Sequence, residues 1–264
     1  MEAVRYSSKS ASWRALRLAV KWILFPGLNI GTRKRMKLGK YFRRGDHSTL
    51  DAGCGNGSFS YHACSLGNRV LGINIDREQI DRSKEFRDFI GLDEERCQFK
   101  VLSIYEVKSL NQTFDQIICF ETLEHLERDS DVLRLFHEVL NRDGVLHISV
   151  PRRIRKPYCG EVFSDEEDGG HLRYGYELTD LEAMLAEAGF SITHTDQVVG
   201  FFSLKVEEAL NWLDLTLTSN VPGGLRELAR GLLFVLLYPF TLLDPISSRY
   251  LCIYVQARLS GQLV

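Results

Sequence analysis

Leu50-Asp51-Ala52-Gly53-Cys54-Gly55-Asn56-Gly57-Ser58-Phe59 is the stretch that decides the fold of this chain. It starts within a short apolar run, residues 48–52, that predicts a buried strand, and it ends where a helix over residues 59–65 is expected. Glycines at every second position allow positive φ angles and let a ligand approach the backbone. The following helix N-terminus offers free N–H donors. The stretch therefore predicts a strand–turn–helix unit with a ligand site at the turn.

Two other interpretations of this turn stay open from the residues alone. It could be an ordinary strand–helix connection, or it could bind a dinucleotide. The dinucleotide fingerprint G-x-G-x-x-G/A is incomplete, because Ser58 stands at its last position. Asp51 would repel a pyrophosphate, whereas its carboxylate could hold an ammonium group.

Strands and helices alternate along most of the chain. The elements expected after the glycine turn are strands over 69–75, 98–102, 114–120 and 145–150, helices over 77–90 and 130–140, and a turn over 141–144. This alternation predicts a mostly parallel sheet with helices on both faces. The pattern ends with a helix over 177–188, strands over 190–198 and 251–258, and an apolar helical insertion over about 200–250.

Composition and charge limit the class of protein. The 264 residues are 44% hydrophobic and 26% charged, which fits a globular chain and excludes a disordered, collagen-like or disulfide-stapled one. Residues 1–47 contain 12 Lys and Arg against Glu2 and Asp46, a net charge of +10, so the remainder carries −12. The six cysteines are scattered without a C-x-x-C pair, so reduced thiols are expected.

The sequence carries little sign of secretion or of a bilayer span. The N-terminus is polar up to Ser12 and does not resemble a signal peptide. The longest uncharged apolar run, residues 232–243, is shorter than the about 20 residues that a span needs. These features predict a cytoplasmic protein, with a peripheral membrane location left open.

Four motifs carry a family resemblance. LDAGCGNGSF resembles the first motif of the class I S-adenosylmethionine (SAM)-dependent methyltransferases. The other three resemble the family's fourth-strand motif, its fifth-strand motif and the segment that follows: FDQIICFETLEHL (114–126), LNRDGVLHISVP (140–151) and HLRYGYELTDLEAMLAEAGF (171–190). Together they cover about residues 45–198. The resemblance implies an α/β, Rossmann-like fold with a seven-stranded, mostly parallel sheet whose last strand is antiparallel, and SAM as the cofactor.

The resemblance also implies which residues surround the cofactor. The residues expected near its methionyl part are Asp51, Gly53, Cys54, Gly55, Asn56 and Gly57, and those expected near its ribose are Asn74, Ile75 and Asp76. Ser103 and Ile104 are expected near its adenine, and Cys119, Phe120 and Glu121 are expected below its sulfonium. The chain departs from the family twice, with Asn74 and Ser103 where acids are usual. Whether Asn74 or Asp76 holds the ribose stays open.

Two histidines are candidate catalytic bases. A base helps methyl transfer when the acceptor is a hydroxyl, an amine or a carbon acid. His125 and His171 follow the fourth and fifth expected strands, at the sheet edge where open α/β folds bind ligands. His125 could instead only orient its loop. No metal is predicted, since the acidic run 165–168 reads as a solvated loop, and Glu121 with Glu124 reads as a loop or cofactor contact.

The basic N-terminal arm has three interpretations. Residues 13–25 combine tryptophans with Arg14, Arg17 and Lys21, and residues 33–44 contain seven basic side chains. This profile fits a helix at an anionic membrane surface. It also fits a helix packed over the cofactor pocket. Nucleic acid is not an expected partner, because no RNA-binding domain accompanies the arm.

These observations lead to one functional prediction and two rivals. We expect an arm over residues 1–44 and a SAM-dependent methyltransferase domain over residues 45–264. The apolar insertion favours a small or lipid-linked acceptor methylated on oxygen, such as a quinone precursor, a sterol-like molecule or a lipid-linked sugar, although the insertion could simply complete the core. The rivals are C-methylation of a lipid or isoprenoid, and an inactive SAM-fold scaffold. No obligate protein partner is evident from the sequence.

Overall fold

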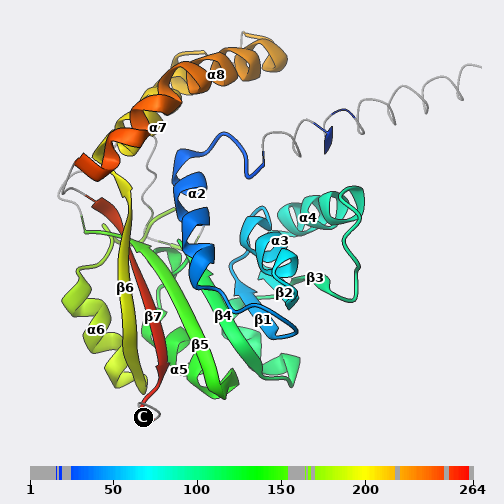
Figure 1. Cartoon of the computed structure of the whole chain (residues 1–264), viewed down its shortest axis with the longest axis vertical. Helices are drawn as coiled ribbons and strands as arrows, with labels where there is room; N and C mark the ends of the chain where they lie inside the picture. The colour runs from blue at the N-terminus through cyan, green and yellow to red at the C-terminus, as the bar shows by residue number, and fades with distance from the viewer. Residues whose placement is uncertain are drawn as a thin grey trace, which may run out of the picture.

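A seven-stranded sheet forms the centre of the molecule (Figure 1). The computed structural model describes residues 25–153, 170–217, 221–246 and 250–261, together with residues 16, 18, 19, 164, 166 and 167. The strands lie in the order β3-β2-β1-β4-β5-β7-β6. Their bounds are Ser48–Ala52 (β1), Arg69–Asn74 (β2), Cys97–Val101 (β3), Phe114–Phe120 (β4), Leu140–Pro151 (β5), Phe190–Gly200 (β6) and Tyr250–Leu259 (β7).

Strands β1 to β5 are parallel to one another, whereas β7 runs antiparallel to both β5 and β6. The predicted seven-stranded sheet with an antiparallel last strand is confirmed. Strand residues alternate between the two faces, so adjacent Ile117 and Ile118 belong to different core clusters. Helices α5 and α6 contribute to the first cluster, and α3 contributes to the second.

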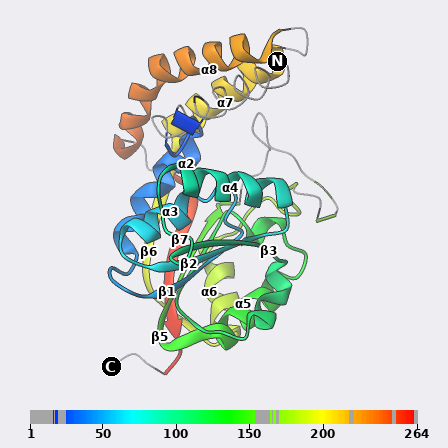
Figure 2. The same cartoon turned by 90° about the vertical axis from the view of Figure 1, so that its right-hand side faces the viewer.

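The helical elements cover both faces and one end of the sheet (Figure 2). They are α2 (Ile30–Arg35), η1 (Met36–Tyr41), α3 (Ser58–Ser65), α4 (Arg77–Phe89), η2 (Ile104–Leu110), η3 (Leu123–His125), α5 (Asp129–Val139), α6 (Leu178–Glu187), α7 (Phe201–Thr216), α8 (Gly223–Leu237) and η4 (Tyr238–Ile246).

One local prediction is wrong. Residues 141–144 were expected to form a turn before the fifth strand, yet they lie within β5. Phe114 pairs with Leu140 and Gln116 pairs with Val145, so the register shifts and the extra residues bulge out of the ladder. Neighbouring strand contacts therefore decide the structure of a segment whose composition favours a turn.

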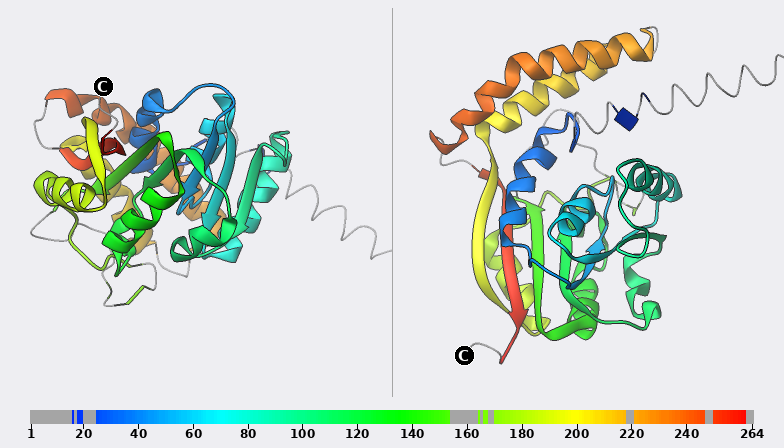
Figure 3. Two further views of the ribbon diagram at one scale, coloured as in Figure 1. Left: turned by 90° about the horizontal axis from the view of Figure 1, so that it is seen from below. Right: turned by 45° about the vertical axis from the view of Figure 1, so that its right-hand side comes forward.

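The predicted insertion is a helical hairpin. Helices α7, α8 and η4 connect β6 to β7 and project beyond the edge at which the parallel strands end (Figures 1 and 3). Ile30 of α2 packs with Val206, Leu210 and Phe234 of the hairpin. Residues Gly223–Ile246 form a helical segment that is long and apolar enough to cross a membrane by length and composition alone.

The second half of the basic arm packs onto the domain. Lys34 pairs with Asp244 at 3.1 Å, and Lys40 pairs with Asp196 at 3.0 Å. Of the expected interfacial helix over residues 13–25, only Leu16, Leu18, Ala19 and Phe25 lie within the described residues. The membrane interpretation of that helix therefore stays a prediction.

Candidate functional site

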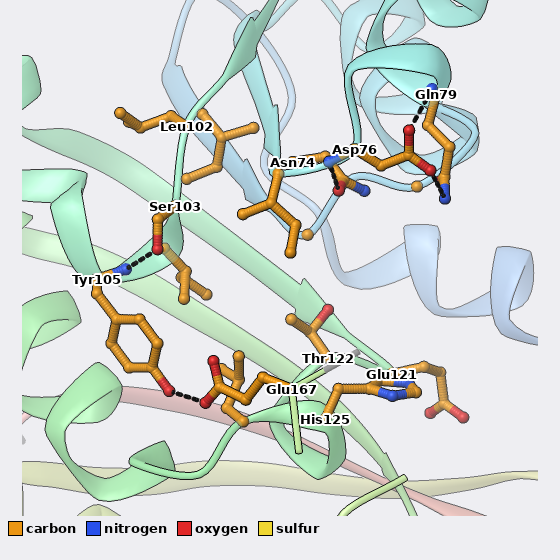
Figure 4. Close-up of a pocket in the computed structure, with 16 residues that line it drawn as sticks. Asn74, Asp76, Gln79, Leu102, Ser103, Tyr105, Glu121, Thr122, His125 and Glu167 are labelled. Atoms are coloured by element: carbon orange, nitrogen blue, oxygen red, sulfur yellow. Dashed lines mark hydrogen bonds between the residues drawn. The ribbon is translucent and has the colours of Figure 1, made fainter. Parts of the chain in front are cut away.

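A cavity of about 600 Å³ lies at the carboxyl ends of β1 to β4 (Figure 4). Most of its lining comes from the segments that follow these four strands, where ligands bind in open α/β sheets, and Glu167 comes from a later loop. The lining residues are Gly53, Gly55, Ile73, Asn74, Ile75, Asp76, Gln79, Leu102, Ser103, Ile104, Tyr105, Glu121, Thr122, His125, Leu126 and Glu167. Most of the residues implied by the family resemblance are thus brought together.

The glycine turn borders this cavity. The backbone N–H groups of Gly53 and Cys54 both donate to the Ile73 carbonyl, at 3.0 Å each, which ties the turn to the end of β2. A Cβ on Gly53 would lie 2.4 Å from Thr122 Oγ1, so glycine is required there by packing. A Cβ on Gly55 would meet no protein atom closer than Gln79 Oε1 at 3.7 Å. The space beside Gly55 is therefore open to a ligand.

Asp51 and Asn56 lie next to the turn but not in the cavity lining. Ser60 Oγ donates to Asp51 Oδ2 at 2.6 Å, and the carboxylate is buried. Burial raises the pKa of Asp51 to about 6, although the hydrogen bonds from Ser60 oppose this change. Asn56 Oδ1 accepts from the Ser58 backbone N–H and Oγ at the start of α3. Cys54 and Gly57 are also outside the lining.

Asn74 and Asp76 lie at the end of β2 with different hydrogen bonds. Both Asp76 carboxylate oxygens accept from the first turn of α4: Oδ1 from the Glu78 and Gln79 backbone N–H groups, Oδ2 from Gln79 Nε2. Asp76 therefore caps this helix. Asn74 Oδ1 accepts from the Asp76 backbone N–H at 2.9 Å. Its amide nitrogen makes no hydrogen bond within the described part of the chain.

The wall beyond β3 joins segments that are distant in sequence. Ser103 Oγ accepts from the Tyr105 backbone N–H and caps η2, while Ile104 is buried. Tyr105 Oη donates to Glu167 Oε1 at 2.5 Å, and the same oxygen accepts from the Glu127 N–H. The acidic run was expected to be a solvated loop, yet Glu167 contributes to the cavity wall.

Glu121 is held in place from three sides. It adopts a positive φ of 50°, and its backbone N–H donates to Ser149 O at 2.8 Å. Ser149 Oγ donates to its Oε1, while Arg35 of α2 lies 3.0 Å from its Oε2. Cys119 and Phe120, which were expected beside Glu121 on the cavity floor, are buried in β4 and lie outside the lining.

His125 and His171 contact each other, although they come from different loops. Their ring centroids are 4.7 Å apart, and only His125 lines the cavity. His125 Nδ1 lies 2.9 Å from the Gly170 carbonyl oxygen. Because a carbonyl only accepts, Nδ1 carries the proton and Nε2 keeps the lone pair in the neutral ring. Burial lowers the pKa of His125, an effect that the Gly170 carbonyl partly offsets.

Glu124 lies next to the two histidines, with its Oε1 3.9 Å from His125 Nε2. Its side chain is buried, and its carboxylate oxygens have no hydrogen-bond partner among the described residues. Burial, followed by repulsion from Glu121, raises the pKa of Glu124. The ligand atoms of Glu124, His125 and His171 lie within 4.8 Å of one another, so these side chains could together hold a cation.

Several lining residues were missed by sequence reasoning. Gln79, Tyr105, Thr122 and Leu126 line the cavity, and Arg35 supports it from α2. Thr122 and Leu126 lie within the quoted fourth-strand motif, so that motif could have indicated them. Arg35 offers no local signal, because it is one of seven basic residues in a short run.

The cavity fits the residue types that SAM requires. Polar side chains of Asn74 and Asp76 lie on one side, and Glu121 and His125 lie on another, with Leu102 and Ile104 also in the lining (Figure 4). Such a lining suits a ligand with a polar sugar, a flat apolar base and a charged amino acid. The missing Cβ of Gly55 leaves the backbone accessible to it.

Comparisons with known proteins identify a family. Residues 44–189 match a family model described as a methyltransferase domain. The mitochondrial ubiquinone biosynthesis O-methyltransferase of Bos taurus is 30% identical over 186 residues, which are 67% of this chain and 50% of that protein. The enzyme of the same name from Actinobacillus pleuropneumoniae serotype 7 is 31% identical over 44% of this chain and 51% of its own length. The chain spans about half the length of these curated relatives.

Solved structures share the fold. The [4+2]-cyclase SpnF has a TM-score of 0.59 at 16% identity, covering 84% of this chain and 80% of its own. Coclaurine N-methyltransferase bound to N-methylheliamine and SAH has a TM-score of 0.56 at 18% identity, covering 85% and 70%. The cyclopropane synthase MmaA2 from Mycobacterium tuberculosis has a TM-score of 0.56 at 19% identity, covering 85% and 82%. These three proteins are named for different reactions, so the shared fold does not identify the acceptor.

Proposed function

This chain belongs to the class I SAM-dependent methyltransferases, and from its site we propose that it transfers the methyl group of SAM to an oxygen of a lipid-linked acceptor. The observation that carries the proposal is His125, whose unprotonated Nε2 belongs to a cavity-lining side chain. The relatives named as ubiquinone biosynthesis O-methyltransferases support oxygen as the methylated atom. We take a hydroxylated benzene ring with a polyprenyl tail, a quinone precursor, as the acceptor class.

The lining residues would hold the cofactor in a fixed orientation. The open side of Gly55 would admit the methionyl part, and the Asn74 amide would donate to a ribose hydroxyl. We assign the ribose to Asn74 rather than to Asp76, because both Asp76 oxygens already cap α4. Ile104 would pack against adenine. Bound SAM would supply an electrophilic methyl group, whose bond to sulfur breaks to leave a neutral thioether as an in-line nucleophile bonds to the methyl carbon.

The chain's own residues would position and deprotonate the acceptor. His125 Nε2 would accept the hydroxyl proton as the new C–O bond forms, and the Gly170 carbonyl keeps the ring in the required tautomer. His171 packs against the His125 ring and would orient it rather than touch the acceptor. Tyr105 and Glu167 are hydrogen-bonded to each other and would form one wall beside the acceptor.

An acceptor of this kind resides in a membrane, so we also propose a peripheral membrane location. The cytoplasmic location predicted from the sequence remains a prediction. Only the names of the relatives favour O-methylation over C-methylation. Identifying the methylated atom in the product would distinguish the two reactions. The inactive-scaffold interpretation differs by predicting no transfer at all.

The test is methyl transfer from isotopically labelled SAM to a polyprenylated catechol, with the product analysed by mass spectrometry and NMR. We expect an O-methyl product. His125→Gln should lower turnover by about 10²–10⁴-fold while SAM affinity stays near wild type. His171→Ala should have a smaller effect. A C-methyl product would replace the proposal by its rival, and a folded, SAM-binding protein that methylates no hydroxylated acceptor would overturn it.

A further inference from the structure

The outer face of the helical hairpin is apolar and exposed to solvent. We define this outer face as Leu225, Leu228, Leu232, Val235, Leu236, Phe240, Leu242, Leu243 and Ile246. Along α8, Leu225, Leu228, Leu232 and Val235 recur every three or four positions, and Val235 and Ile246 are 72% and 78% exposed. A surface helix of a soluble protein normally turns polar residues outward. An aliphatic stripe of this length indicates a binding surface.

The opposite face of the same helix is attached to the protein. Phe234 is buried against Ile30 of α2 and against α7. Arg230 pairs with Asp214 of α7, and Asp244 pairs with Lys34 in a buried position. A helix that carries these ion pairs along its inner side cannot enter the hydrocarbon core alone. Although Gly223–Ile246 is long enough to span a bilayer, its packing therefore favours a position parallel to the surface.

Cationic side chains border the outer face. Leu242, an outer-face residue, also lines a second cavity of about 280 Å³ together with Lys34, Lys37 and Lys40. Lys34 and Lys40 are paired with Asp244 and Asp196. Lys37 is exposed, and it forms no ion pair with any described residue. An ammonium group next to aliphatic side chains is complementary to a phospholipid, which joins a phosphate to acyl chains.

We propose that the outer face of α8 and η4 rests on an anionic phospholipid bilayer, with Lys37 at the lipid phosphates. The charge border and the purely apolar stripe favour a bilayer over a second copy of the chain or another protein, whose interfaces mix apolar and polar groups. The hairpin starts from the sheet edge that also carries the cofactor cavity, so the docked protein would present its site near the membrane. This surface would provide the peripheral membrane location proposed above, and its binding to a bilayer does not require methyl transfer.

Vesicle flotation tests this inference with the full chain. The vesicles are phosphatidylcholine alone or equimolar phosphatidylcholine and phosphatidylglycerol. The wild type should float with the anionic vesicles, less so at high salt. The triple variant Leu232→Ser, Val235→Ser, Leu236→Ser should bind at least tenfold more weakly. Lys37→Glu should weaken binding to anionic vesicles only. Phe89→Ser, which removes an exposed apolar side chain from α4, is the matched control and should bind as the wild type does.

The same samples show whether the variants fold and whether the outer face binds a second copy of the chain instead of a bilayer. The triple variant should keep its melting temperature and its SAM affinity, since the outer face is exposed. A wild type that ignores both kinds of vesicle, or a triple variant that floats equally well, would overturn the inference. A dimer in light scattering that the triple variant loses, without vesicle binding by the wild type, would assign the face to a second copy instead.

Discussion

The guanidinium of Arg35 lies 3.0 Å from Glu121 Oε2, and this pair joins the N-terminal helix α2 to the carboxyl end of β4. The side chains are 13% and 22% exposed, so water screens them only partly. Glu121 lines the cavity, and Arg35 therefore fixes one of its walls from a segment outside the family-matched region, residues 44–189. The helical arm is thus part of the site's support.

Removing Arg35 should leave the Glu121 carboxylate without its cation. We expect Arg35→Met to lower the free energy of unfolding by about 2–4 kcal/mol, slightly less than for fully buried pairs. The double variant Arg35→Met, Glu121→Gln should recover part of this loss, because it removes the uncompensated charge. Urea unfolding of both variants measures the effect. Equal stability of the wild type and Arg35→Met would show that the pair contributes nothing.

Gly55 and Gly91 form a matched pair for testing the cofactor cradle. Both have positive φ, 50° and 72°, and neither has a close neighbour for an added Cβ. Alanine at either position should therefore cost about 1–2 kcal/mol of stability. Only Gly55 faces the cavity, so Gly55→Ala should weaken SAM binding at least tenfold in calorimetry while Gly91→Ala leaves it unchanged. Equal SAM affinity in the two variants would contradict the assignment.

Asp51→Asn should affect stability and cofactor binding in opposite directions. Burial raises the pKa of Asp51 to about 6 from an ordinary 3.8, so between these values the folded state binds more protons than the unfolded state. The contribution of Asp51 to stability therefore falls as pH rises through this window. Near neutral pH, the free energy of unfolding of the variant should exceed that of the wild type by up to about 3 kcal/mol. This difference should disappear below about pH 4.

The same variant tests the role implied by the family resemblance. If the carboxylate attracts the methionyl ammonium, SAM affinity should fall about tenfold to hundredfold, since charged hydrogen bonds contribute about 1.5–3 kcal/mol. Urea unfolding across the pH range and calorimetry at neutral pH provide the two readouts. A stability difference that does not change with pH would show that Asp51 has an ordinary pKa.

Variants of Asn74 and Asp76 should differ in which property they change, SAM affinity or the stability of the fold. Asp76→Ala removes the cap of α4 and should lower stability by about 1 kcal/mol. Asn74→Ala should instead lower SAM affinity and leave the unfolding midpoint nearly unchanged. Calorimetry and thermal unfolding of both variants make the comparison. The reverse result, with SAM affinity depending mainly on Asp76, would move the ribose contact to that residue.

Local sequence patterns predicted much of the sheet, and the family resemblance implied several residues that border the cavity. The run 48–52 matches β1, and Gly53, Gly55, Asn74, Ile75 and Ser103 all border the cavity. The strand depends on backbone propensities and short-range spacing, whereas Asn74, Ile75 and Ser103 were implied by the resemblance to a known family. The contact of His125 with His171 and the position of Glu167 could not be predicted, because they join loops about 40 residues or more apart. The same holds for Arg35, whose partner Glu121 lies on another element.

The ends of the helical insertion are adjacent, since Gly200 of β6 pairs with Tyr250 of β7. A two-stranded ladder already closes its base, so the length and content of the insertion can change without altering the register of the sheet. The hairpin is therefore an exchangeable module: its replacement by a short turn would preserve the strand order. Among the described elements, α2 would lose a packing surface, because its buried Ile30 packs with Phe234 on the inner side of α8. The content of the hairpin is still constrained through α2, which packs Ile30 on the hairpin and pairs Arg35 with Glu121 at the cavity.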